Sequence, residues 1–297
     1  MFGQYSNSFL RFVSEKRFLY AYYERFLSAI SDLKRYQIVP LKDFRKTNPP
    51  DHIVISLRHD VDGDLQSAIE MAKIEHQHNI KSTFFILHTA PYYGVTKKGR
   101  AEHSEELIPE LKKLQDEYGH EIGWHNDLVT LQCIYGIDPK QYLQKELCWL
   151  RSKGIKITGT ASHGSIYCYK YKYHNSYFFS EFSEPIDEFP STSVINIGQE
   201  HCIIAKASLA QFGLEYEAYH LDNGFYFSDS AFVKGGRLRW SPEGLHLEGF
   251  KVKDKVIILI HPEHWDHSMY RKFLKRIRNR FRNQPLSEKL LECNLSK

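Results

Sequence analysis

The chain has 297 residues, 42% of them hydrophobic, so it can bury the core of one large domain or of two small ones. Its 40 basic and 36 acidic residues leave a formal net charge of +4, which is too near balance to indicate a nucleic-acid-binding protein. Five scattered cysteines without a CxxC pair argue against a disulfide framework or a structural zinc site. Because we find no signal peptide and no segment long enough to cross a bilayer, we expect a cytoplasmic location.

The first part of the chain is expected to be helical. Aromatic and apolar residues recur at steps of three and four over residues 8–35, which predicts one or two helices packed on the main body. Pro40 and the Pro49-Pro50 pair then indicate a linker. We therefore divide the chain into an N-terminal helical extension, residues 1–50, and a main domain, residues 51–297.

Strands and helices alternate after residue 52. Helices are predicted at about 65–78, 103–118 and 139–153, between strands at 53–57, 81–87, 121–124 and 155–160, and a last apolar strand is predicted at 256–260. Such alternation predicts a parallel sheet, either open or closed into a barrel. Over 161–250 the pattern loosens, with short strand-like runs at 194–197, 201–205, 224–228 and 237–240.

A basic segment follows the last strand. Residues 271–282, RKFLKRIRNRFR, contain seven basic residues, no acidic one, and apolar residues at helical spacing. A terminal helix with one solvated face is the commoner explanation. The alternative is that residues 270–282 contact an anionic membrane surface or a phosphate-bearing substrate.

Carboxylates follow the first strand of the main domain. Asp60 and Asp62 are two residues apart, so in an extended chain their side chains point the same way. They repel each other unless a cation or a shared proton lies between them, which favours a metal-centred hydrolytic site over a surface turn. Other strands end at or near His125, His163 and His261, and the carboxyl ends of parallel strands share one edge of the sheet. A lone histidine after a strand is more often structural, but the repetition favours a common pocket.

The order of these segments resembles a known family. The matching text is HDVDGD at 59–64, STFFIL at 82–87, GHEIGWHND at 119–127 and LIHPEHW at 259–265, with ASHG at 161–164 in the place of the third motif. It resembles the polysaccharide deacetylase family, also called the NodB homology domain or carbohydrate esterase family four. It is also similar to a WbmS-like subgroup from bacterial surface-polysaccharide clusters. The resemblance covers about residues 53–265.

The resemblance implies an α/β fold, a distorted barrel of seven or eight β/α units, and an enzyme that removes an N-acetyl or N-formyl group from an amino sugar. It implies a divalent metal, with Zn²⁺ expected and Co²⁺ or Ni²⁺ as alternatives. By position, Asp60 is the general base, Asp62 and His125 are metal ligands, and His261 is the general acid. Because no export signal is found, we expect a nucleotide- or lipid-linked precursor in bacterial surface-polysaccharide synthesis rather than finished polymer.

One position departs from the family pattern. The family has a second histidine four residues after the first, and here that residue is Val129. Another residue could supply the ligand, with His163 the best candidate; weaker ones are Asn126, Asp127, His59 and His88. Alternatively, the metal is bound weakly and other groups do the chemistry, or catalysis has been lost.

Further residues are expected near the substrate. Arg58 is expected to pair with Asp60 or a neighbouring carboxylate and to tune its basicity. Asp229 and Trp240 lie where the family lines its pocket and orients the acid histidine, and Asp127 joins this substrate-binding set. His264 is expected to be a metal or substrate contact or, more commonly, a surface histidine.

Two other functions stay open for the whole protein. One is a catalytically inactive sugar-binding or scaffold protein of a polysaccharide assembly system, and the other is a metal-poor hydrolase of a non-sugar amide.

Overall fold

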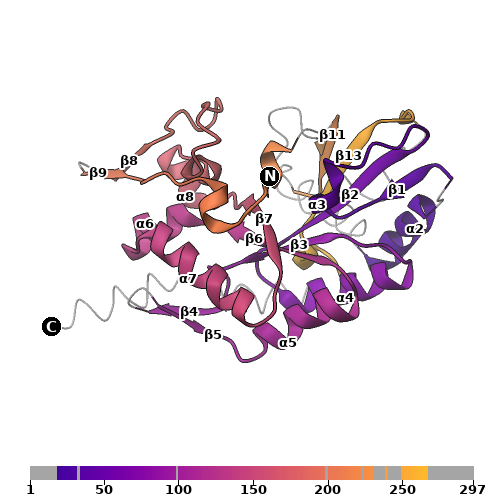
Figure 1. Ribbon diagram of the computed structural model, residues 1–297, viewed down its shortest axis with the longest axis horizontal. Coiled ribbons are helices and arrows are strands. Elements are labelled where there is room, and N and C mark those ends of the chain that lie inside the picture. Colours follow the sequence, from indigo (N-terminus) through magenta and orange to yellow (C-terminus); the bar gives the residue numbers. More distant parts are fainter. Residues whose placement is uncertain are drawn as a thin grey trace, which may run out of the picture.

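The structure is a computed structural model that describes residues 19–31, 34–97, 100–197, 200–221, 224–230, 238–239 and 249–266. Trp240, the first part of the predicted N-terminal helical region and the predicted basic helix at 270–282 lie outside these residues. At the centre is a parallel β-sheet, with α4 and α5 below it in the view of Figure 1.

The main sheet has the strand order β10-β7-β6-β3-β2-β13-β11-β12, with β1 paired to β2 beside β3, and every pairing is parallel. It curls into half a barrel, and within the described residues its outer strands β10 and β12 do not pair with each other. The strands of this sheet are β1 (Tyr36–Ile38), β2 (Ile53–Val61), β3 (Thr83–Leu87), β6 (Glu121–Asn126), β7 (Ile157–Ser162), β10 (Tyr216–Glu217), β11 (Phe225–Ser228), β12 (Leu238–Arg239) and β13 (Lys255–Ile260).

Strand β2 organises the sheet because it has three partners. Along one edge, β1 pairs with residues 53–55 and β3 pairs with residues 58–61, while β13 pairs with residues 54–59 along the other edge. The three-residue strand β1 lies within the segment that the sequence predicts as a linker. Residues before position 51 therefore contribute a strand to the main sheet.

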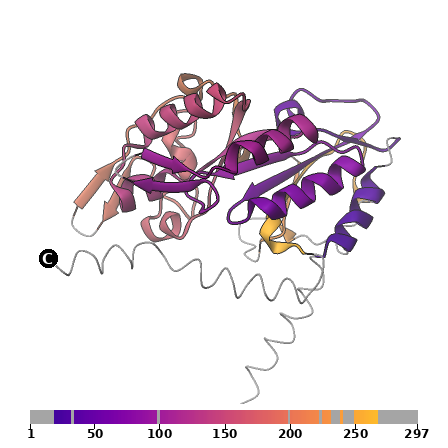
Figure 2. The ribbon, with the colours of Figure 1, turned by 90° about the horizontal axis from the view of Figure 1, so that it is seen from below.

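Helices cover one face of this sheet, and Figure 2 shows α4 and α5 in front of it when the molecule is seen from below. Two antiparallel hairpins lie outside the sheet: β4 (Gly94–Lys97) with β5 (Arg100–His103), and β8 (Val194–Ile197) with β9 (Glu200–Ile203). The α-helices are α2 (Tyr20–Ile30), α3 (Leu41–Phe44), α4 (Leu65–Gln77), α5 (Leu107–Lys112), α6 (Leu128–Tyr135), α7 (Pro139–Ser152) and α8 (Ile166–Tyr171). Short turns of other helical types are η1 (Lys113–Glu117), η2 (Asn175–Phe178), η3 (Leu209–Phe212), η4 (Ala218–His220) and η6 (Pro262–His264).

Alternation along the strands separates the core from the candidate site. In β2, Ile53, Ile55 and Leu57 pack in the helix-covered core, whereas Val54 packs with α3 in a smaller cluster on the other face of the sheet. Arg58 and Asp60 lie on the same face of the strand as Val54, nearer to its carboxyl end. All nine residues of β2 are buried, so this polar pair lies inside the protein.

The expected α/β class with a parallel sheet is confirmed. Each of the five predicted core strands is present, and the predicted helices at 65–78 and 139–153 match α4 and α7. The region predicted as one helix at 103–118 is α5 followed by a π-helical turn, η1. No helix within the described ranges is both long and apolar enough to cross a membrane.

Candidate metal and acid–base site

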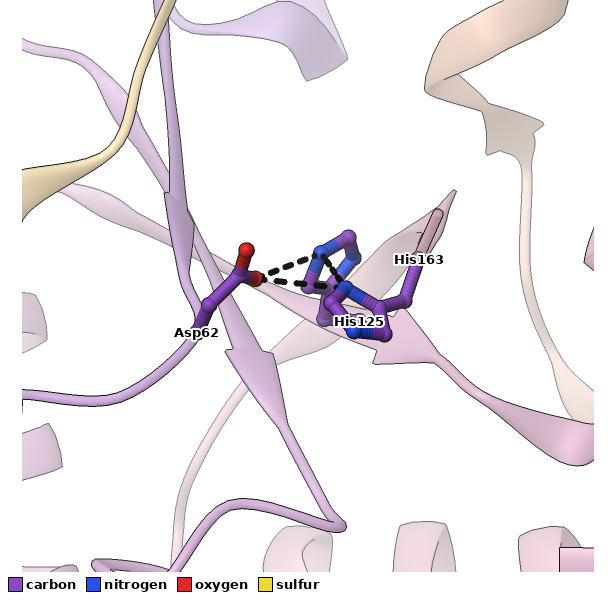
Figure 3. Close-up of side chains that lie close together, drawn as sticks. All are labelled: Asp62, His125 and His163. Carbon is purple, nitrogen blue, oxygen red and sulfur yellow. Dashed lines mark hydrogen bonds and ion pairs between the residues drawn. The ribbon is translucent and has the colours of Figure 1, made fainter. Parts of the chain in front are cut away.

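The carboxyl ends of three neighbouring strands bring together an acidic residue and two histidines. Asp62 follows the last residue of β2, His125 lies near the end of β6, and His163 follows β7. Asp62 Oδ1 lies 3.1 Å from His125 Nε2 and 3.3 Å from His163 Nδ1, and the two nitrogens are 3.3 Å apart (Figure 3). The sequence predicted these three residues as metal ligands, and they form a group that could hold a metal ion.

The donor group fits a tetrahedral ion. Ligand atoms bound tetrahedrally to Zn²⁺ at about 2.0–2.1 Å lie about 3.3 Å from one another, which matches the three separations. His125 Nδ1 lies 2.9 Å from the carbonyl oxygen of Ala161 and, as the donor of that bond, leaves the lone pair of Nε2 directed at the group. Asp62 Oδ1 is screened from solvent and faces the two imidazole nitrogens of the group. These donors fit a divalent cation.

Charge within the donor group favours an ionised aspartate. Burial raises the pKa of Asp62, but His163 and His125 outweigh that effect and hold this pKa well below its usual range. Burial likewise lowers the pKa of His163, and Asp62 more than offsets this to raise it to about 9. A cation that binds here therefore displaces a proton from His163 at neutral pH.

Asp60 lies beside this group in a paired state. Arg58 binds it with two hydrogen bonds, Nε to Oδ1 at 2.8 Å and Nη2 to Oδ2 at 2.7 Å, and both side chains are buried. Burial alone raises the pKa of Asp60, but Arg58 and His125 together lower it below its ordinary value. Asp60 Oδ2 lies 3.5 Å from His125 Nε2, so an ionised carboxylate directly adjoins the donor group.

His261 approaches from the other side, at the end of β13. Its Nδ1 lies 2.5 Å from Asp229 Oδ1, and its Nε2 lies 4.0 Å from Asp62 Oδ2. Asp229 Oδ2 accepts bonds from the His261 main-chain N–H and from Trp265 Nε1. Burial lowers the pKa of His261, but Asp229 overcomes this and raises it to about 10, so the imidazole is protonated at neutral pH.

A second group that could hold a metal ion consists of Asp229, His261 and His264. Its carboxylate is already engaged, because three donors from His261 and Trp265 occupy the two oxygens. His264 Nδ1 lies 3.4 Å from Asp229 Oδ2 and adds to this engagement. The arrangement is therefore better suited to orienting His261 than to binding an ion.

Exposure identifies the open side of the site. The side chains of Asp62, His163 and His261 are 27%, 18% and 13% exposed, whereas those of Asp60 and His125 are 5% and 1% exposed. Asp62, His163 and His261 are therefore partly accessible from solvent, whereas Asp60 and His125 are buried.

The weaker candidates for the missing ligand have other partners. His59 points to the helix-covered face and binds Glu75, Asn126 donates to the Asn175 carbonyl, and His88 accepts the main-chain N–H of Asp127. Asp127 is buried with Oδ2 3.1 Å from Thr89 Oγ1, outside the donor group. The predicted pairing of Arg58 with Asp60 is confirmed, and a contact between Arg58 and the substrate stays a prediction.

One acidic residue near the site was missed in the sequence. Glu263 follows His261 by two residues, its Oε2 is screened from water, and within the described chain this atom has no hydrogen-bond partner. Burial and the charge of Asp62 raise the pKa of Glu263 to about 7. Its place between His261 and His264 in the LIHPEHW segment was the available signal.

Comparison with known proteins adds no family assignment. No family model matches the chain, and no curated protein is similar to it above the threshold for a significant match. The chemistry of the site is therefore argued from its own residues.

Proposed function

We propose that this chain is a metal-dependent amidohydrolase that removes an N-acetyl or N-formyl group from an amino sugar. The convergence of Asp62, His125 and His163 on one point is the observation that carries this proposal. An ionised carboxylate and a protonated imidazole beside the donor group support it, because amide hydrolysis needs a base that takes a proton from water and an acid that gives one to the departing amine.

The donor group would hold a divalent cation, with Zn²⁺ proposed and Co²⁺ or Ni²⁺ as alternatives. Such an ion, when bound, polarises the amide carbonyl and lowers the pKa of water. Asp60 would accept the proton of the attacking water. Arg58 keeps Asp60 ionised and fixes its orientation, so the base is in its active form at neutral pH.

His261 would donate a proton to the departing amine. Its Nδ1 is engaged by Asp229, so Nε2 is the nitrogen left to face the substrate. The raised pKa of His261 keeps this proton in place until the C–N bond breaks. Environment thus pushes the pKa values of acid and base apart, in the directions that the two roles require.

The substrate class follows from the motif resemblance. An amino sugar linked to a nucleotide or to a lipid, as a precursor of a bacterial surface polysaccharide, is the substrate we propose. The exposed edges of Asp62, His163 and His261 support a substrate that presents its acyl group at the end of a larger molecule.

Amine release from a panel of N-acetyl and N-formyl amino sugars, free and nucleotide-linked, tests the proposal. The Zn²⁺-loaded protein should release amine, and His261→Ala should abolish turnover while retaining the metal. Asp62→Ala should lose both. A loaded protein that binds these sugars without releasing amine would instead support an inactive sugar-binding protein, and release only from non-sugar amides would reject the substrate class.

A further inference from the structure

Asn175 connects the main chains around two of the three candidate ligands. It is completely buried at the start of η2, twelve residues after His163. Its Nδ2 donates to the carbonyl oxygen of His163 at 2.8 Å, and its own carbonyl accepts from Asn126 Nδ2 at 3.2 Å. The main-chain N–H of His163 in turn donates to the Asn126 carbonyl at 2.9 Å. The three residues form a closed ring of hydrogen bonds, and Asn126 directly follows His125.

The other end of the Asn175 amide binds helix α6. Asn175 Oδ1 accepts the main-chain N–H of Val129 at 2.9 Å, in the first turn of the helix. Asp127, the residue before α6, makes no side-chain capping bond to the helix. Asn175, which is distant in the sequence, therefore accepts one of the N–H groups that the first turn of α6 leaves free. Because Val129 offers a donor and His163 an acceptor, the orientation of the amide is fixed.

These contacts explain how a loop histidine can replace a helical one. Val129 occupies the position at which the resembled motif carries a second histidine, and its side chain is buried in the core. His163 lies instead on the segment between β7 and α8, where no regular structure of its own fixes it. The side-chain amide of Asn175 binds the main chain of both Val129 and His163.

We propose that Asn175 is a positioning residue that holds His163 in the geometry of the metal site, an inference that rests on the proposed function. Asn175 touches neither the cation nor the substrate. It acts through the main chain of His163, whose Nδ1 must stay close to both Asp62 and His125. Groups behind the ligands of a metal site change metal affinity when they are removed.

The test is the Zn²⁺ dissociation constant, measured by competition with a chelating dye, of the unaltered protein and of Asn175→Ala. We expect Asn175→Ala to bind Zn²⁺ about 10- to 100-fold more weakly. The visible spectrum of the Co²⁺-loaded variant should also change shape, which a loss of stability alone would not produce. If Asn175→Ala fails to fold, Asn175→Asp serves instead, because it keeps an acceptor for Val129 and loses the donor to His163.

Ser82→Ala is the matched control. Ser82 is also completely buried and donates to Glu75 Oε2 at 2.5 Å, at the other end of β3 and on the helix-covered face. Its removal should leave Zn²⁺ affinity within about twofold. Affinity of the Asn175 variant within about fivefold of the unaltered protein, or no lower than that of Ser82→Ala, would overturn the positioning role alone. Absence of Zn²⁺ binding by the unaltered protein would reject the proposed function, and the positioning role with it.

Discussion

At the scale of single residues, Arg58 and Asp60 form a buried ion pair in which each charge depends on the other for stabilisation. A guanidinium and a carboxylate are buried together on one strand, and Arg58 also lies over the ring of Phe85 with its Cζ 5.4 Å from the ring centre. A buried ion pair is costly to break from one side, because the remaining charge has no partner.

Replacing Arg58 should therefore have a large effect. We expect Arg58→Met to lower the free energy of unfolding at neutral pH by about 3–5 kcal/mol, measured by urea denaturation. The loss should shrink in acid, since burial then raises the pKa of the unpaired Asp60 and the carboxyl becomes neutral. Adding Asp60→Asn should restore part of the stability. Equal losses in the single and double variants would contradict this account of the pair.

His88 gives a prediction on pH. It is buried, it stacks on Trp124 with ring centres 4.7 Å apart, and burial lowers its pKa to about 3. Its unfolded form gains a proton below about pH 6.5, whereas its folded form does not until about pH 3. The contribution of His88 to stability is therefore complete above pH 6.5 and is lost as the pH falls toward 3.

The variant His88→Gln isolates this effect, because glutamine can still accept the N–H of Asp127. Over pH 6 to 4, the stability of the unaltered protein should fall more steeply, by up to about 1.4 kcal/mol per pH unit. Chemical denaturation at several pH values measures both slopes. Parallel slopes would show that His88 takes up its proton equally well in the folded state.

At the scale of elements, the sequence predicted the long apolar strands and the short runs that form β8, β9, β11 and β12, and it missed other short elements such as β1 and α6. Residues 53–57 of strand β2 and most of strand β13 are near-continuous apolar runs, which is typical of buried parallel strands. Strand β1 has three residues, too few for a period to be detected. Helix α6, LVTLQCIY, is apolar nearly throughout, and such a run does not distinguish a helix from a strand.

Close contact between β6 and β3 is a feature that only the structure reveals. A Cβ atom at Gly123 would lie 2.3 Å from two ring atoms of Phe85. We expect Gly123→Ala to destabilise the protein by about 1–3 kcal/mol through overpacking. Adding Phe85→Leu should recover part of this loss, and Gly249→Ala, where the added methyl meets open space, should stay within about 0.5 kcal/mol in thermal denaturation. A neutral Gly123→Ala would show that the strands can separate without cost.

The sequence also predicted the members of the donor group but not their supports. Asp62, His125 and His163 could be named because each follows or ends a strand, and the edge of a parallel sheet brings such positions together. Asn175 carried no comparable signal, and the signal for Glu263 was its place in the LIHPEHW segment. Asn175 acts through main-chain contacts with residues 12 to 49 positions away, and such contacts leave no spacing to recognise.

At the scale of the whole molecule, one curled sheet gathers residues from Arg58 to His261. A buried polar network ties the helices to it: Glu75 of α4 binds His59 of β2 at 2.7 Å and accepts the hydroxyl of Tyr23 in α2. His59 precedes Asp60, so the strand that carries the candidate base is fixed from the helix-covered face. The N-terminal helix and the candidate site are thus parts of one structure.

The central claim is that Asp62, His125 and His163 hold one divalent ion, and the Zn²⁺ content of the desalted protein tests it most directly. After loading, mass spectrometry of the metal should find about one ion per chain in the unaltered protein and in His261→Ala. Asp62→Ala and His163→Ala should each retain far less. An unaltered protein without Zn²⁺, or a His163→Ala variant that retains as much as the unaltered protein, would contradict the account.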